Sequence, residues 1–218
     1  MEITGRSGEI FRLLIPLIQQ RATPVVAREN LLKLKLFAAL CLAFGSLSAA
    51  PITGLFNTGE STTGSADNYW TIVSPPGAGQ VVSPVSVPAP WLPNTADSSW
   101  EWSTTTAQPV GSPSSPLVYT FRHQFLLDSS FNSSTVLISG RWSTDNTGTG
   151  IRVNGNNFAQ TSPGFTAWSG FSLNSGFVSG LNVVEFVVED TGAFGGFRVE
   201  WLTAEADLNA VPAPEPGT

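Results

Sequence analysis

Residues 139–157 constrain the fold of this chain more than any other stretch. Apolar residues alternate with polar or small ones on both sides of a Thr/Asp/Asn/Gly loop at residues 144–150. A period of two is typical of a strand with one buried face. Asn154-Gly155 then forms a pair that tolerates positive φ, which predicts a tight reversal of the chain. The stretch therefore predicts the middle of a β-sandwich.

The same pattern continues from residue 51 to residue 206. Short runs rich in Val, Phe, Trp and Thr are separated by Gly, Pro, Asn and Ser clusters at intervals of about ten residues, as in sandwiches and jelly rolls. No stretch after residue 50 has a helical period. We expect strands at residues 54–57, 69–73, 81–87, 99–102, 117–127, 135–142, 150–153, 166–173, 182–189 and 196–203. The predicted fold is all-β, a single jelly-roll-like antiparallel sandwich over residues 51–206.

Residues 1–50 read as a basic leader and a secretory signal peptide. Lys33 and Lys35 precede an apolar run at residues 36–47, and small residues follow up to Ala50. The run is too short to cross ~30 Å of hydrocarbon comfortably. We therefore predict a signal helix that signal peptidase removes by cleavage after Ala50. Cys41, the single cysteine, lies in the apolar run, so the exported domain would have no disulfide.

The charge of the exported part argues against two classes of partner. Without residues 1–50, the chain keeps four Arg and no Lys against thirteen Asp and Glu, a formal charge of −9. Nucleic acids and anionic membranes attract surplus positive charge, which this domain lacks. A neutral or cation-bearing partner suits it better.

The Pro-rich tail at residues 207–218, which we expect to be disordered, carries a short motif. Pro214-Glu215-Pro216 resembles the start of the PEP-CTERM sorting signal, found on exported proteins of Gram-negative bacteria that make exopolysaccharide. In that family a membrane-spanning helix and an Arg cluster follow, and we expect that the sequence is cut short before them. The resemblance implies processing by an exosortase through a transient membrane-anchored intermediate. The destination would be the cell surface or the extracellular matrix.

The domain also resembles PEP-CTERM proteins, along nearly all of residues 54–201. The matching pieces include L-F-N-T-G at residues 55–59, G-R-W-S-T-D-N-T-G-T-G-I-R-V-N-G at residues 140–155, and G-F-R-V-E at residues 196–200. The I-x-V-N-G and G-x-N-x-x-x-F patterns of the second half are similar to galactose-binding-like jelly rolls. Carbohydrate-binding modules often have that fold, so the resemblance implies a fold more than an activity.

The sequence offers little for catalysis. His123 is the only histidine, and it alternates with aromatic residues on a strong strand, which favours a position in the core. The chain has no G-x-S-x-G motif and no histidine pair for zinc. No two carboxylates are marked by their spacing as a glycosidase pair. We predict that the protein is not an enzyme.

Binding has better support, because the exported part holds seven tryptophans. Aromatic rings stack on the apolar faces of sugars. Trp70, Trp142 and Trp201 are in phase with apolar strand residues and are predicted to lie in the core, whereas Trp100 and Trp102 fit either environment. Trp91 and Trp168 lie among prolines or small residues and are the expected exposed candidates for ligand contact.

Two acidic loops complete the set of candidates. Asp145 and Asn146 could give a carboxylate and an amide to a sugar, and Asp190 lies in a second loop at the end of a strand. Ordinary turns use the same residues. A calcium ion is compatible with the first loop, but we predict no metal or cofactor.

We therefore predict a non-catalytic module that binds polysaccharide. The alternative is a structural matrix protein whose sandwich is a spacer without a small-molecule site. Two exposed tryptophans beside the Asp145 loop would favour the binding module. A mostly buried set of tryptophans without an aromatic-lined groove would favour the spacer. A further expectation is that Arg122, Glu185, Arg198 and Glu200 pair across an exposed sheet face.

Overall fold

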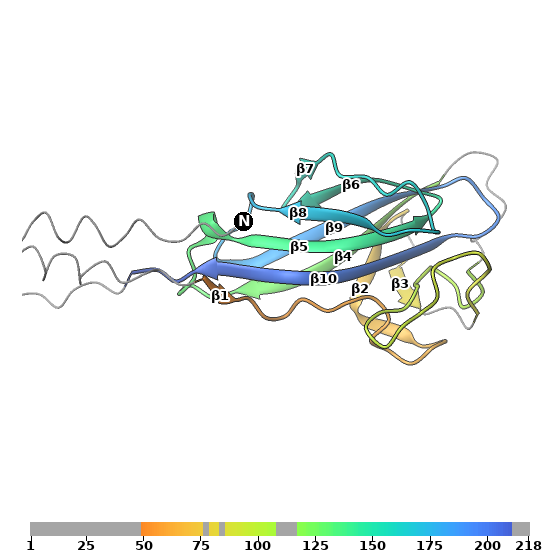
Figure 1. The fold of residues 1–218 in the computed structure, drawn as a ribbon, viewed down its shortest axis with the longest axis horizontal. Helices are drawn as coiled ribbons and strands as arrows, with labels where there is room; N and C mark the ends of the chain where they lie inside the picture. The colour runs from red at the N-terminus through yellow and green to blue at the C-terminus, as the bar shows by residue number, and fades with distance from the viewer. Residues whose placement is uncertain (1–48, 76–78, 83–85, 108–116, 211–218) are drawn as a thin grey trace, which may run out of the picture. The chain divides into compact units, whose positions relative to one another are not determined.

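A computed structural model describes residues 49–75, 79–82, 86–107 and 117–210 of the chain (Figure 1). These residues are almost entirely strands and their connections. The elements are β1 (Ala49–Pro51), β2 (Ala66–Ser74), β3 (Gly79–Val82), β4 (Leu117–Leu127), η1 (Ser133–Thr135, a 3-10 turn), β5 (Leu137–Asp145), β6 (Thr147–Val153), β7 (Asn156–Phe158), β8 (Ser169–Leu173), β9 (Gly180–Asp190) and β10 (Gly196–Asp207).

The strands form two sheets in which every pair is antiparallel. The four-stranded sheet has the order β1-β10-β5-β8, and the six-stranded sheet has the order β3-β2-β4-β9-β6-β7. Figure 1 shows β10, β5 and β8 lying across β4 and β9. The predicted all-β sandwich is confirmed at this level.

Aromatic side chains from the two sheets meet in the core. Trp70 packs against Phe186 and Phe197, with ring centroids 5.8 and 5.2 Å apart. Trp142 packs on Phe186 from the four-stranded sheet, at 5.2 Å. Trp70 and Trp142 are buried as predicted, and Trp201 is partly buried against the same cluster. Rings of this size bury much apolar area, so they contribute strongly to the packing between the two sheets.

The inward face of β4 follows the predicted alternation. Tyr119, Phe121, His123 and Phe125 are all buried. Both ring nitrogens of His123 face backbone carbonyl oxygens, with Nδ1 3.1 Å from Tyr69 O and Nε2 3.0 Å from that of Gly54. Burial lowers the pKa of His123. The prediction that this histidine belongs to the core is confirmed.

The central stretch folds only partly as predicted. Asn154 and Gly155 both have positive φ, at 49° and 83°, and they join β6 to β7 in a tight hairpin. The polar loop predicted at residues 144–150 is wrong, because β5 continues to Asp145 and β6 begins at Thr147. Asn146 alone connects them, at the corner where the chain passes from the four-stranded sheet to the six-stranded one.

The segment at residues 86–107, here called the cap segment, closes one open edge of the sandwich. The strand predicted at residues 99–102 is reduced to two isolated bridges, from Glu101 to Phe197 of β10 and from Trp102 to Val82 of β3. The segment thereby joins the two sheets. Trp102 enters the main core, whereas Trp91 and Trp100 form a second, smaller cluster with Ala107.

The boundaries differ in detail from those predicted. β1, which was not predicted, pairs with the end of β10, and residues 54–57 form no strand. The predicted signal helix and the Pro214-Glu215-Pro216 motif lie outside the described residues. No helix within the described ranges is long and apolar enough to span a membrane. The same ranges contain no group of three or more His, Cys, Asp or Glu side chains able to hold a metal ion.

Candidate functional site

Four of the five residues predicted to contact a ligand lie together in the structure: Trp91, Asp145, Asn146 and Asp190. They lie where β5 passes into β6 and where β9 ends. Trp91 Nε1 donates to Asp145 Oδ2 at 2.9 Å, and Asn146 Nδ2 donates to Asp145 Oδ1 at 2.8 Å. Asn146 Oδ1 accepts hydrogen bonds from the backbone N–H and the hydroxyl of Thr191, at 2.7 and 2.9 Å. Asp190 is close enough to raise the pKa of Asp145 through its charge. The two acidic loops predicted from sequence are therefore neighbours in space.

Trp91, Asp145 and Asp190 are nevertheless closed to solvent, and Asn146 is partly exposed. Trp91 is 7% exposed, Asp145 5% and Asp190 0%, so the expectation that Trp91 is an exposed ring is wrong. The cap segment folds Trp91 onto Trp100, at 4.4 Å between ring centroids, and its indole N–H needs the Asp145 carboxylate once it is buried. Burial raises the pKa of Asp145 to about 6, against the lowering effect of the bond from Trp91.

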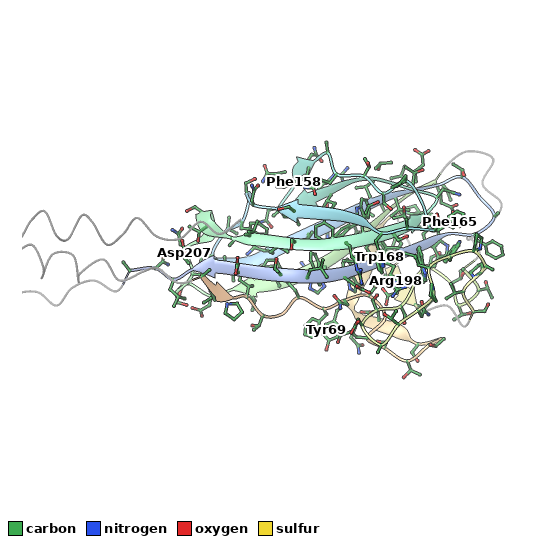
Figure 2. All side chains as sticks on the ribbon, viewed as in Figure 1. Tyr69, Phe158, Phe165, Trp168, Arg198 and Asp207 are labelled. Atoms are coloured by element: carbon green, nitrogen blue, oxygen red, sulfur yellow. The ribbon has the colours of Figure 1, made fainter. Side chains whose placement is uncertain are left out.

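Trp168 is the predicted aromatic contact that stays partly exposed. It precedes β8, on the outer face of the four-stranded sheet (Figure 2). The guanidinium carbons of Arg141 and Arg198 lie over its ring, 4.6 and 4.7 Å from the centroid. Such cation–π contacts hold an aromatic ring in place on a surface that would otherwise leave it mobile.

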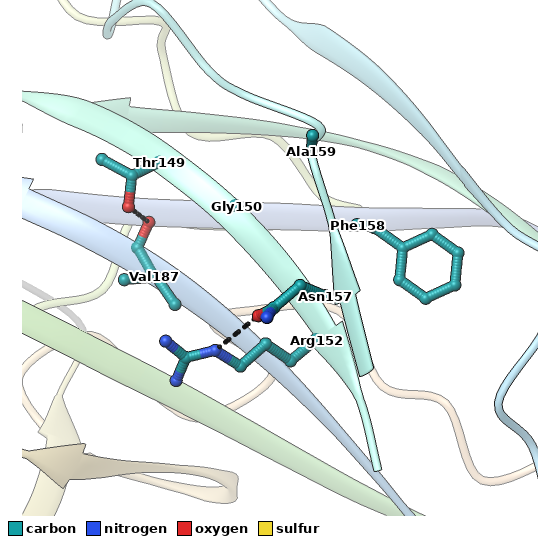
Figure 3. Close-up of a pocket in the computed structure, with 7 residues that line it drawn as sticks. All are labelled: Thr149, Gly150, Arg152, Asn157, Phe158, Ala159 and Val187. Carbon is teal, nitrogen blue, oxygen red and sulfur yellow. Dashed lines mark hydrogen bonds between the residues drawn. The ribbon is translucent and has the colours of Figure 1, made fainter. Parts of the chain in front are cut away.

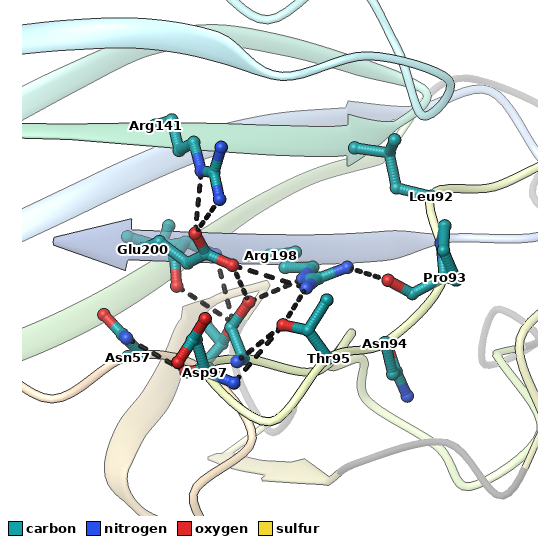
Figure 4. A network of polar contacts seen from close by, with 12 residues as sticks. Asn57, Leu92, Pro93, Asn94, Thr95, Asp97, Arg141, Arg198 and Glu200 are labelled. Carbon is teal, nitrogen blue, oxygen red and sulfur yellow. Dashed lines mark hydrogen bonds and ion pairs between the residues drawn. The ribbon is translucent and has the colours of Figure 1, made fainter. Parts of the chain in front are cut away.

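A polar network beneath Trp168 fixes both arginines (Figure 4). Arg198 donates to Ser98 Oγ at 2.6 Å, to the carbonyl of Pro93 at 2.6 Å and to Thr95 Oγ1 at 3.0 Å. Glu200 accepts from Ser98 at 2.7 Å and from Arg141 Nε at 2.7 Å. Although burial would raise the pKa of Glu200, the hydrogen bonds from Ser98 and Arg141 lower it overall.

The sequence predicted that four charged residues pair on one exposed sheet face: Arg122, Glu185, Arg198 and Glu200. This expectation is wrong in part. Arg122 and Glu185 do pair on the six-stranded sheet, at 2.6 Å. Arg198 and Glu200 lie on the other sheet and are only 1% and 3% exposed. They are buried because the cap segment covers the outer face of β10, and the strand pattern of β10 alone could not reveal that cover.

One hollow was not foreseen. A cavity of about 290 Å³ opens beside the edge hairpin β6–β7 (Figure 3), and its lining residues are Thr149, Gly150, Arg152, Asn157, Phe158, Ala159 and Val187. The pairing of β6 with β9 shifts between Gly148 and Gly150, which leaves Thr149 as a bulge. The bulge and the missing side chain of Gly150 create the hollow, and the G-T-G sequence was the available signal.

A scan against protein-family models found no match, and neither a curated protein nor a solved structure matches the chain.

Proposed function

We propose that this chain is an exported, non-catalytic module of jelly-roll type that binds polysaccharide through Trp168. The observation that carries the proposal is the partly exposed indole ring of Trp168, which the guanidinium groups of Arg141 and Arg198 contact on the outer face of the four-stranded sheet. A ring fixed in advance loses little conformational entropy when a sugar stacks on it. Trp168 takes the role that the sequence also assigned to Trp91.

The surroundings of the ring suit a polyhydroxylated ligand. The Arg141 side chain is 40% exposed and retains donor capacity beside its bond to Glu200. Gly170, exposed on β8, offers no side chain that would block access along the sheet. Ser139 and Thr203 add two hydroxyl groups, 2.6 Å apart, further along the same sheet. A sugar stacked on Trp168 would therefore meet donors and acceptors on one shallow strip.

Export and delivery to the cell surface or extracellular matrix remain part of this proposal. Their support is the signal-like sequence before Ala50 and the Pro214-Glu215-Pro216 motif. Signal peptidase and an exosortase are the corresponding processing partners. Both chain ends of the described domain meet in one strand pair, because β1 pairs with the end of β10. A domain tethered by its C-terminal tail would thus be held from that end.

The second candidate function is a structural spacer in the matrix. Burial of Trp70, Trp91, Trp100, Trp102 and Trp142 favours it, because these five rings stabilise the fold and offer no surface to a ligand. The spacer differs from the binding module in one respect that can be measured. A spacer would fold as stably as the binding module and would show no retention in gels that contain polysaccharide.

Affinity electrophoresis of the full-length chain separates the two functions. Gels loaded with single bacterial exopolysaccharides, with and without calcium, report retention directly. Retardation by one polymer and not by others supports the binding module. A protein that melts cooperatively and migrates freely through every polymer is a spacer.

A further inference from the structure

The cavity beside β6 and β7 contains a cation with free hydrogen-bonding capacity. Arg152, with 41% of its side chain exposed, donates from Nε to Asn157 Oδ1 at 3.1 Å. Its terminal nitrogens make no hydrogen bond to any residue that the structure describes, and NH1 is 3.9 Å from Glu185 Oε2. The fork of the guanidinium is thus oriented by Asn157 and open towards the cavity (Figure 3).

The acidic side chains near Arg152 do not fully neutralise its positive charge. Glu185 is only 14% exposed, and its carboxylate is engaged by Arg122 at 2.6 Å through NH2 and 3.0 Å through Nε. Two arginines therefore face one glutamate across adjacent strands. Glu189 is the next outward acid on β9, and it pairs in register with Thr147, at the other end of β6 from Arg152.

The rest of the lining is suited to one small ring. Val187 and Ala159 supply apolar surface, while Thr149 and Asn157 supply a hydroxyl and an amide. The ring of Phe158 packs against the core and points away from the other lining side chains, so Phe158 lines the cavity with its backbone (Figure 3). A volume of about 290 Å³ lies at the lower limit of ligand pockets, which span roughly 300–1,000 Å³. This volume suits a single sugar ring better than a long chain lying in a groove.

We propose that this cavity is a second binding site, which takes one carboxylate-bearing sugar ring and pairs its carboxylate with the guanidinium of Arg152. Arg matches a carboxylate with two parallel hydrogen bonds, which a neutral hydroxyl cannot reproduce. The site goes beyond the proposed function, because it lies on the six-stranded sheet and does not need Trp168. Its ligand is a uronic acid, either free or as a residue of an acidic polysaccharide.

Titration calorimetry of the full-length chain tests the site with tetragalacturonate, glucuronate and maltotetraose as probes. The salt concentration is about 0.15 M, where exposed charges more than ~8 Å apart are largely screened. We expect the acidic probes to bind and maltotetraose to show no Arg152-dependent binding. Binding of both acidic probes identifies the ring itself as the ligand, and binding of the tetramer alone identifies a residue within a polymer.

Three variants locate the binding. Arg152→Gln should weaken tetragalacturonate binding by roughly tenfold or more, the effect of losing a charge-assisted hydrogen-bonded pair. Arg152→Lys should fall between that variant and the wild type, because it keeps the charge and loses the fork. Gly150→Leu should abolish binding by filling the hollow. Ser129→Glu changes the net charge by the same amount at an exposed turn that does not line the cavity, and it leaves the pairing of Arg122 with Glu185 intact, so it should bind nearly as well as the wild type.

The proposal is overturned if Arg152→Gln binds like the wild type, or if Ser129→Glu loses as much affinity as Arg152→Gln, since the attraction is then general electrostatics. It is also overturned if Trp168→Ala alone abolishes binding of the acidic tetramer. That result would place the ligand on the other sheet and would leave the polysaccharide-binding proposal intact. Loss of polymer retention in Trp168→Ala with unchanged tetragalacturonate binding would support both sites independently.

Discussion

Glu101 gives the sharpest prediction about stability, because two buried carboxyl groups meet there. Its side chain has no exposed surface, and Oε1 accepts the backbone N–H of Gly59 at 2.8 Å. Glu101 Oε2 and Asp67 Oδ2 are both buried without a donor from any other residue that the structure describes. Burial, followed by the hydrogen bond to Asp67 and its charge, raises the pKa of Glu101 well above its ordinary value. We infer that Glu101 is protonated and shares its proton with Asp67.

Glu101→Gln reproduces the protonated acid without the need to take up a proton. The amide oxygen can accept from Gly59 and the amide nitrogen can donate to Asp67. In the wild type the raised folded pKa makes stability greatest near and below the unfolded pKa of about 4.3. As the pH rises above the unfolded pKa, the free energy of unfolding falls by up to about 1.4 kcal/mol per pH unit, until the pH reaches the folded pKa. The variant lacks this slope, so it should be more stable than the wild type at pH 7, by about 1–3 kcal/mol.

Urea denaturation between pH 5 and pH 8, followed by tryptophan fluorescence, measures the difference between the two proteins. That difference should grow in favour of Glu101→Gln as the pH rises. Glu205→Gln, at an exposed position of β10, controls for the loss of one charge. A Glu101→Gln variant that is less stable at pH 7 and keeps the wild-type slope would refute the shared proton.

Three more predictions follow from the cap segment. Trp91→Phe removes the N–H that lowers the pKa of Asp145, so carbon NMR should find a higher pKa for Asp145 than in the wild type, and an unchanged or lower pKa contradicts the bond. Gly196→Ala places a methyl group against the rings of Trp91 and Trp100 and should cost about 1–3 kcal/mol in urea denaturation, whereas unchanged stability would mean that the cap segment is mobile. Arg198→Gln leaves the buried Glu200 carboxylate with less compensation and should cost about 3–5 kcal/mol, and a neutral effect would contradict its burial.

The sequence was sufficient where local rules decide the structure. The alternation in β4 places His123 in the core, and Asn154-Gly155 defines its hairpin because few other pairs adopt positive φ twice. The class of fold followed from many such local signals. The strands β1 and β7 were missed because each has only three residues, too few to show a period.

The candidate site was less predictable, because its exposure depends on a segment without regular structure. The Pro- and Ser-rich sequence before Trp100 reads as a surface connection, yet the cap segment packs on β10 and buries Trp91 and Arg198. Strand periodicity cannot report what covers the outer face of a sheet. The Asp145 and Asp190 loops, named separately as candidates, lie close together, but each carboxylate is buried among groups of the protein itself.

The most direct test of polysaccharide binding compares two variants in affinity gels made with a polymer that retards the wild type. Trp168→Ala removes the stacking surface, and Leu202→Ala removes an exposed apolar side chain of β10 as a control. We predict that Trp168→Ala migrates as in a gel without polymer while its melting temperature changes little, and that Leu202→Ala is retarded like the wild type. Undiminished retardation of Trp168→Ala would contradict the account.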